Sequence, residues 1–452
     1  MTKEEGSPSN VSNNEEEIVA KERVSNVPRE VADAKQKTIQ NTVQSLVDRV
    51  KKARNSNRFS SIYTAPSRLR DLNPSLFIPR VVSIGPLHKE KLNLKSTEAR
   101  KAAFVNELLS EIGFIDETLH NCVQKVYDKI ERIRGCYDGM KKTAYNDDEF
   151  TQMMVMDACF ILQFISKLSG SGNLLSDNRL RSRSIALDLV LLENQIPFFV
   201  LEDIYESTIN KLQSRPSLIT MLSNLLGYIN PFTDCIKMDN IGTETTHDHI
   251  LGLLHKVYLP KLPNSSTISV LPTAHSAVEL DKIGVKFRPK DEKIWPLSID
   301  FQSSSHKPTL RMPVVVIDNF FEVVVKNLIV YEQYSPVYNY VTSYAMALDM
   351  LVDSPADIAK LGESDVLVNH LGSNEKASDM IKNICKDVTF LDFYYIDSWK
   401  RMDTYYDSYW SKCIGVLKQK YFSSPLTAVG LLAGIIIFIV TVVQLPFQIK
   451  QS

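Results

Sequence analysis

The sequence lacks the features that most directly indicate a chemistry. Its formal charge is −1 over 452 residues, so no net basic field favours nucleic acid as a partner. The signatures G-x-S-x-G, G-x-G-x-x-G, H-E-x-x-H and the P-loop are absent, so the sequence contains none of these common enzyme motifs. The cysteines form no C-x-x-C pair and lie far apart, at Cys122, Cys136, Cys159, Cys235, Cys385 and Cys413. This spacing excludes a zinc ribbon and a dense disulfide framework, and it predicts reduced, mostly buried thiols.

Targeting signals are missing from the N-terminal region as well. The first residues are polar and acidic, without the apolar core of a secretory signal peptide. Thr2 and the final Lys-Gln-Ser do not fit myristoylation or prenylation. We therefore expect any membrane attachment to use another segment.

One long apolar run is present near the C-terminus. Thr427–Leu445, TAVGLLAGIIIFIVTVVQL, contains no charged residue. As a helix it would be roughly 28 Å long, close to the hydrocarbon thickness of a bilayer. The run predicts a single transmembrane helix followed by a short tail, 446–452; the alternative is a buried core helix. Lysines are more numerous before the run than after it, which predicts a cytosolic body by the positive-inside rule.

The remaining chain divides by composition. Residues 1–36 are acidic and poor in aromatic side chains, which predicts a disordered arm. Residues 37–57 are expected to form an amphipathic helix, because apolar residues recur at helical spacing from Ile39 to Val50. Its basic end could touch phospholipid headgroups or simply be solvated. Residues 58–422 form the expected globular body.

The body is predicted to be predominantly α-helical, of the α+β class. Apolar residues at helical spacing dominate up to residue 260 and again after residue 320. Short β-branched runs between 284 and 318 predict a small antiparallel sheet, and 81–85 predicts one further strand. A single helix is expected over 397–421. Whether the helical segments form one domain or two is left open.

A polar cluster interrupts the densest apolar stretch of the body, residues 185–205. Its members are Asp188, Glu193, Asn194 and Gln195. Buried polar groups need partners, so these four residues either form a functional site with shifted pKa values or have a structural role, pairing with a buried arginine or capping a broken helix. Asp157 is a further carboxylate expected inside the core, and Pro197 is expected to interrupt or restart the helix.

Other candidate groups favour structural roles. The arginines between residues 58 and 80 fit ion pairs with acidic residues better than a phosphate site. His247, His249 and His255 lie in a helix-like segment where a two-residue spacing points side chains to different faces, so zinc is disfavoured. His88 is expected to be a structural histidine. Asn264 begins a glycosylation sequon, which matters only if the body is extracellular.

Several blocks in a fixed order resemble one plant family, domain of unknown function 247, over roughly residues 58–446. They include VVSIGPLH, MMVMDACFIL, DLVLLENQIPFFVL, SAVELDKIGVKF and LRMPVVVID. Three positions depart from the family pattern: Lys89-Glu90 stands where it has His-Gly, Thr97 where it has Met, and Leu426 where it has Trp. The resemblance implies a membrane-attached plant protein without an assigned enzymatic activity. It also implies kinship with determinants of self-incompatibility in grasses, and it transfers no catalytic residues.

The expected function is therefore non-enzymatic recognition or signalling by a membrane-anchored plant protein, with the self-incompatibility type as one form of it. The expected partners are a membrane, through Thr427–Leu445, and an unidentified protein; nucleic acid and cofactors are not expected. One alternative is a tail-anchored scaffold on endomembranes. Another is an enzyme that uses the region of Asp188 and Glu193.

Overall fold

The structure is a computed structural model. It describes residues 34–51, 60–140, 143–169, 173–212, 216–233, 246–261, 272–290, 295–303, 307–389, 392–421 and 425–449. The chain separates into two compact units, Met1–Phe59 and Ser60–Ser452.

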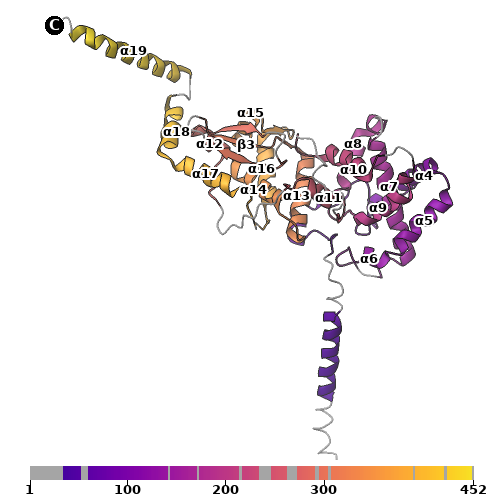
Figure 1. Cartoon of the computed structure of the whole chain (residues 1–452). Coiled ribbons are helices and arrows are strands. Elements are labelled where there is room, and N and C mark those ends of the chain that lie inside the picture. Colours follow the sequence, from indigo (N-terminus) through magenta and orange to yellow (C-terminus); the bar gives the residue numbers. More distant parts are fainter. Residues whose placement is uncertain are drawn as a thin grey trace, which may run out of the picture. The chain divides into compact units, whose positions relative to one another are not determined.

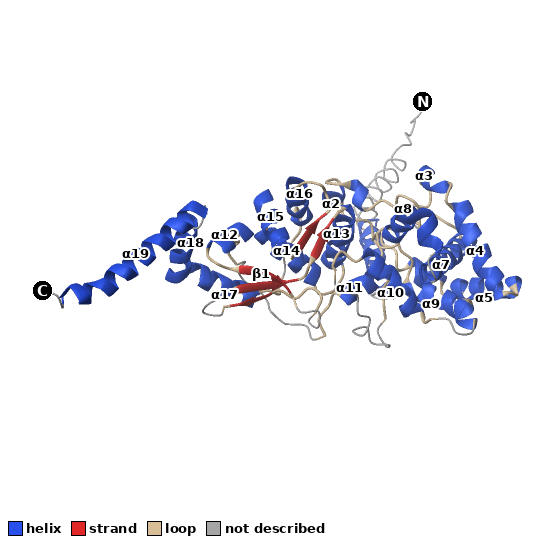
Figure 2. Ribbon diagram, turned by 90° about the horizontal axis from the view of Figure 1, so that it is seen from above, coloured by secondary structure: helices blue, strands red, loops and turns tan. Residues whose placement is uncertain are grey.

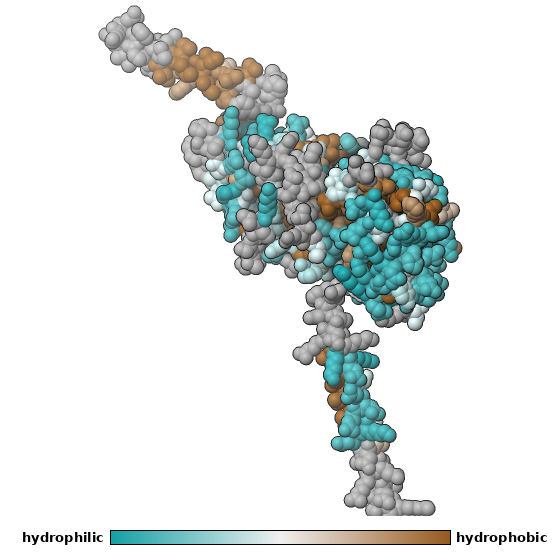
Figure 3. Space-filling model, turned by 45° about the vertical axis from the view of Figure 1, so that its right-hand side comes forward, coloured by the Kyte–Doolittle hydropathy of each residue, from teal (hydrophilic) through white to brown (hydrophobic). Residues whose placement is uncertain are grey.

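In the first unit, residues 34–51 form one helix. The helix begins three residues earlier than predicted, so residues 34–36 do not belong to the arm; the remainder of the arm and residues 52–57 lie outside the described residues. Ile39, Val43, Leu46 and Val50 are all exposed. They form the brown stripe along one side of this helix in Figure 3.

The second unit begins with a helical half built around one buried helix. This helix, α7 (Asp147–Ser169), opens with three acidic residues, which suit the positive end of the helix dipole. Nearly every residue from Phe150 to Ile165 is buried, because neighbouring helices pack on all sides of it (Figure 1). The other elements of this half are α2 (Ser67–Arg70), η1 (Pro74–Leu76), α3 (Leu92–Lys95), α4 (Glu98–Ile112), α5 (Ile115–Tyr127), α6 (Ile130–Arg134), α8 (Asn173–Asp188), α9 (Phe198–Ser207), η2 (Ile209–Lys211), α10 (Leu218–Ile229) and α11 (Ile250–Val257).

The second half of this unit combines helices with two small sheets. Figure 2 shows the strands among these helices, away from α4 and α5. The strands are β1 (Lys286–Pro289), β2 (Asp300–Gln302), β3 (Thr309–Met312), β4 (Val315–Ile317) and β5 (Leu367–Asn369). The helices are α12 (Ala277–Lys282), α13 (Asn319–Tyr334), α14 (Tyr340–Leu351), α15 (Pro355–Glu363), α16 (Asn374–Cys385), α17 (Ile396–Asp407) and α18 (Tyr409–Tyr421).

The predicted antiparallel sheet is right for one pair of strands and wrong for the other. The three-stranded sheet has the order β1-β3-β2, with β1 and β3 parallel and β2 and β3 antiparallel. The second sheet pairs β4 with β5 in parallel, across about fifty residues of sequence. Parallel neighbours need a long crossover, and the connection from β4 to β5 contains α13, α14 and α15. The mostly helical class with a small sheet is confirmed.

One hydrophobic core extends through both halves, from Ile62 in the first to Met402 in α17. The predicted helix over 397–421 is two helices, because Ser408 adopts an extended conformation between α17 and α18. α18 is held to the body through Lys418, whose Nζ donates to the Asp281 carboxylate and to the Asp281 carbonyl at 2.7 Å each.

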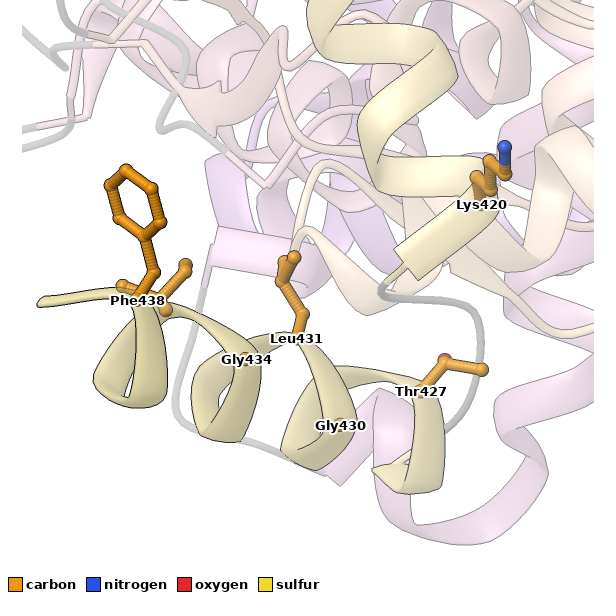
Figure 4. A pocket seen from close by; sticks show the side chains of 7 residues that line it. Lys420, Thr427, Gly430, Leu431, Gly434 and Phe438 are labelled. Atoms are coloured by element: carbon orange, nitrogen blue, oxygen red, sulfur yellow. The ribbon is translucent and has the colours of Figure 1, made fainter. Parts of the chain in front are cut away.

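The last described helix is α19 (Pro425–Ile449), on which most of the described apolar side chains are exposed. Figure 3 shows this helix largely in brown. Figure 4 shows the open groove between α18 and α19, which is lined by Lys420 and by residues of α19 from Thr427 to Phe438, including Gly430 and Gly434. Within the described part of the chain, no helix has both the length and the apolarity needed to cross a membrane.

Candidate functional site: a buried polar centre

The centre is organised around the extended segment of residues 80–85. The prolines that flank it exclude a long helix, and the sequence predicts a strand there. The structure contradicts that strand, since the segment has no strand partner. Its backbone N–H groups donate to buried side chains instead. Buried N–H groups must be paired, so these side chains replace the missing neighbouring strand.

Asp188, the last residue of α8, binds the start of this segment. Its Oδ1 accepts from the Arg80 amide at 2.9 Å, and its Oδ2 accepts from the Val81 and Val82 amides at 2.7 and 2.9 Å. Burial raises the pKa of Asp188 to about 6, although the three amide hydrogen bonds act in the opposite direction. The carboxylate is thus fully engaged by backbone.

Asn194 and Asp157 bind the end of the segment. The Asn194 Oδ1 accepts from the Ile84 amide at 2.7 Å, and its Nδ2 donates to the Val82 carbonyl at 3.0 Å. Asn194 therefore offers a donor and an acceptor to alternate residues, as a neighbouring strand would. The Asp157 Oδ2 accepts from the Gly85 amide at 2.8 Å.

Asp157 is the interior carboxylate expected from the sequence, and it lies in a buried ion pair. The Lys101 Nζ donates to its Oδ1 at 2.5 Å, and neither side chain is exposed. Burial raises the pKa of Asp157, and the Lys101 charge and the Gly85 amide offset part of this rise. A buried ion pair costs desolvation energy, so its presence specifies how α4 and α7 fit together more than it adds stability.

Gln195 closes the centre from the side of α11. Its Nε2 donates to the carbonyls of Leu189 and Leu191 at 2.8 and 2.9 Å, and its Oε1 accepts from the Leu251 amide at 3.3 Å. The main chain of Gln195 approaches Gly85 so closely that a Cβ on Gly85 would lie 2.5 Å from the Gln195 carbonyl oxygen. Gly85 also has a φ of +70°, so only glycine fits this position.

Glu193 points away from these residues into a second group. Its Oε1 accepts from the Ala65 amide at 2.8 Å and from Arg70, and its Oε2 lies 2.9 Å from His88 Nε2. Burial acts to raise the pKa of Glu193, but the hydrogen bonds from His88, Arg70 and the Ala65 amide outweigh it, so the pKa is lower than usual. The structure therefore divides the predicted cluster: Asp188 and Asn194 hold residues 80–84, whereas Glu193 holds the chain near residues 65–70.

The centre leaves little space for a ligand. A cavity of about 20 Å³ lies beside Asp188, Arg80 and Ser184, enough for a single water molecule. His88 Nδ1, Arg70 Nε and Ser83 Oγ are buried without a partner among the described residues. The described part of the chain holds no group of three or more residues arranged to bind a metal ion. The arrangement holds the backbone of residues 80–85 in place, and Asp188 binds a proton at a higher pH than an ordinary aspartate.

The histidine segment is also engaged locally. His249 caps α11, with Nδ1 accepting from the Gly252 amide at 3.0 Å and Nε2 within 3.0 Å of the Ser61 carbonyl. Burial lowers the pKa of His249 to about 4, so its ring is neutral at pH 7. His255 lies 2.9 Å from Glu332 instead, and the two rings therefore serve different partners.

Two of the arginines between residues 58 and 80 form ion pairs. Arg68 and Arg70 pair with Asp387 and Glu193, which confirms the ion-pair interpretation for them. The described cysteines form no disulfide bond with one another. Arg58, Cys235 and Asn264 lie outside the described residues.

Sequence reasoning missed Lys101 and Glu332. Glu332 accepts from the Val341 and Thr342 amides at 2.8 and 2.7 Å and thus fixes the start of α14. A signal was present for Lys101, which shares an i, i+4, i+7 stripe with Val105 and Leu108, a stripe whose apolar members face the core.

Comparison with known proteins defines the family. The family described as "Plant protein of unknown function", domain of unknown function 247, matches residues 62–440. The chain belongs to this plant family.

Relatives within the domain of unknown function 247 family align along most of their length. UPF0481 protein At3g47200 of Arabidopsis thaliana is 27% identical over 420 residues, which cover 85% of each chain. Putative UPF0481 protein At3g02645, from the same plant, is 22% identical over 479 residues, which cover 85% of this chain and 89% of the relative. No solved structure matches the chain.

Proposed function

We propose that this chain is a membrane-attached plant protein whose folded body binds another protein and catalyses no reaction. The proposal rests on one observation, the different positions of the polar and the apolar side chains of this chain. Buried polar side chains of the centre are bonded to backbone, whereas large apolar side chains are exposed on α5 and α19. Exposed apolar patches favour association, since burying them removes apolar surface from water.

Attachment through Thr427–Leu445 is the first part of this proposal. This stretch carries no charge, and residues such as Ile436, Ile437 and Phe438 are exposed along α19. A bilayer would cover them at little cost. The lysine distribution favours a cytosolic body.

Recognition of a protein partner is the second part. The resemblance to relatives implicated in self-incompatibility supports recognition between proteins as the activity, and signalling would follow from it. A scaffold on endomembranes shares the attachment but needs no specific partner.

Expression in plant cells with a tag at each end tests both parts. We expect the full chain to stay with membranes after alkaline carbonate extraction, and a variant lacking residues 427–445 to be released. We also expect protease to reach the N-terminal tag in sealed vesicles, with Asn264 unglycosylated. Release of the full chain, or purification without any stoichiometric partner, would contradict the proposal.

A further inference from the structure

The turn between α4 and α5 holds an aromatic side chain in water. Phe114 is 84% exposed, and it follows Gly113 in a two-residue connection. Figures 1 and 2 both place α4 and α5 at the outer end of the helical half. A large exposed aromatic residue gains nothing from this position in the isolated chain.

The backbone of Phe114 is strained. Its φ and ψ are 46° and 53°, the left-handed conformation that a bulky residue rarely adopts. Glycine or asparagine would fit this turn better, so local folding does not explain why phenylalanine occupies it. Strain of this kind gathers at sites that bind or switch, which points to a use for the side chain.

An apolar ridge continues from Phe114 along α5. Ile115, Leu119, Val123 and Tyr127 recur every four residues, and the first, third and fourth of these are 41%, 43% and 49% exposed. The adjoining face of α5 already buries Thr118, Cys122 and Val126 in the body, and Leu119 packs partly against the core as well. Ridges of residues four apart are the surfaces that helices pack into the grooves of other helices.

The exposed carboxylates near the ridge favour a basic partner over an anionic membrane. Asp116, Glu117 and Asp128 are exposed carboxylates on or beside α5, and Lys125 is engaged with Glu206 at 3.1 Å. Acidic residues in the first turn also suit the helix dipole, but they still repel an anionic bilayer and attract basic groups.

We propose that this surface, Phe114 with Ile115, Leu119, Val123 and Tyr127, binds an amphipathic helix of a partner protein. The partner helix carries an apolar stripe flanked by lysine or arginine. The inference rests on the proposed function, to which it adds the docking surface and the chemistry of the partner.

A designed peptide tests the chemistry directly. The probe is a fluorescent amphipathic helix of leucine and lysine, and its match replaces every lysine by glutamate. Fluorescence anisotropy with the full chain in detergent should show salt-dependent binding of the lysine peptide alone. Val123→Glu should weaken this binding roughly tenfold or more, because a charge enters the centre of the apolar surface.

Leu92→Glu is the matched control, since Leu92 is 83% exposed on α3, outside the ridge. It should leave binding unchanged. Tyr127→Ser, which adds no charge, should also weaken binding, and circular dichroism checks that each variant is folded. Equal weakening by Leu92→Glu, or equal binding of the glutamate peptide, would overturn the inference.

The same variants also test two alternative occupants of the surface, a second copy of this chain and an anionic membrane. A chain–chain dimer in sedimentation that Val123→Glu dissolves, or binding to phosphatidylserine vesicles that Val123→Glu abolishes, would overturn the partner-helix assignment. If the chain purifies from plant membranes with a stoichiometric protein that Val123→Glu and Tyr127→Ser retain, the surface is wrong and the proposed function stands. If no such protein is found, the proposed function itself fails.

Discussion

At the scale of single residues, the polar centre shows side chains doing the work of a β-strand. Asp188, Asn194 and Asp157 together accept hydrogen bonds from the amides of five residues between 80 and 85. Asp188 lies at the end of α8, Asn194 in the turn that follows it and Asp157 in the middle of α7, so residues 80–85 are fixed without sheet pairing. Because a buried N–H without a partner destabilises the fold, these side chains are needed to keep the chain in this path.

The pH dependence of stability tests the protonation of Asp188. Its pKa is about 6 in the folded chain, against an ordinary 3.8, so the folded state binds the proton first as pH falls. The contribution of Asp188 protonation to the free energy of unfolding is fully present below about pH 4 and is lost as pH rises through 6. The wild-type chain should gain up to about 3 kcal/mol relative to Asp188→Asn between pH 7 and pH 4. Denaturant unfolding at several pH values measures this difference, and a constant or shrinking difference would contradict it.

Gly85 allows backbone strain and steric contact to be separated. Gly85→Ala combines a positive φ with a Cβ 2.5 Å from the Gln195 carbonyl oxygen, and it should lower the free energy of unfolding by about 3 kcal/mol or more. Gly139→Ala is the control, since its φ is +65° with nothing within 4 Å of the new Cβ. It should cost only about 1 kcal/mol. Equal effects in chemical denaturation would show that the close approach to Gln195 is not rigid.

At the scale of elements, the sequence predicts what is local and misses what depends on distant partners. The helices before residue 260 and after residue 320 follow from apolar spacing. The parallel partners of β1 and β4 could not be predicted, because pairing across long connections leaves no local signal. In the candidate site, the burial of Asp188, Glu193, Asn194 and Gln195 was predictable from their apolar setting. Their partners in residues 65–85 were not.

The turn between α4 and α5 offers a test of strain at this scale. Phe114→Gly removes an exposed side chain and relieves a left-handed residue, so it should raise the free energy of unfolding by about 1 kcal/mol. Phe114→Leu keeps the strain and should change stability little. Thermal or denaturant unfolding of both variants decides the point. A loss of stability in Phe114→Gly would mean that Phe114 contributes to packing.

At the scale of the whole molecule, the function that we propose belongs to the surface and not to the core. The core extends from Ile62 to Met402, and the polar centre inside it holds backbone in place. Exposed apolar side chains recur along helix 34–51, α5, α18 and α19 in the described part of the chain. We therefore expect the body to be stable by itself and to become functional when a membrane and a protein partner cover these surfaces.

The mass of the native complex tests this claim most directly. The chain, isolated from plant membranes in mild detergent, would be measured by native mass spectrometry. We predict the mass of one chain, 51.3 kDa, plus that of a different polypeptide in fixed ratio. A mass of the chain alone, or of whole multiples of it, would contradict the account.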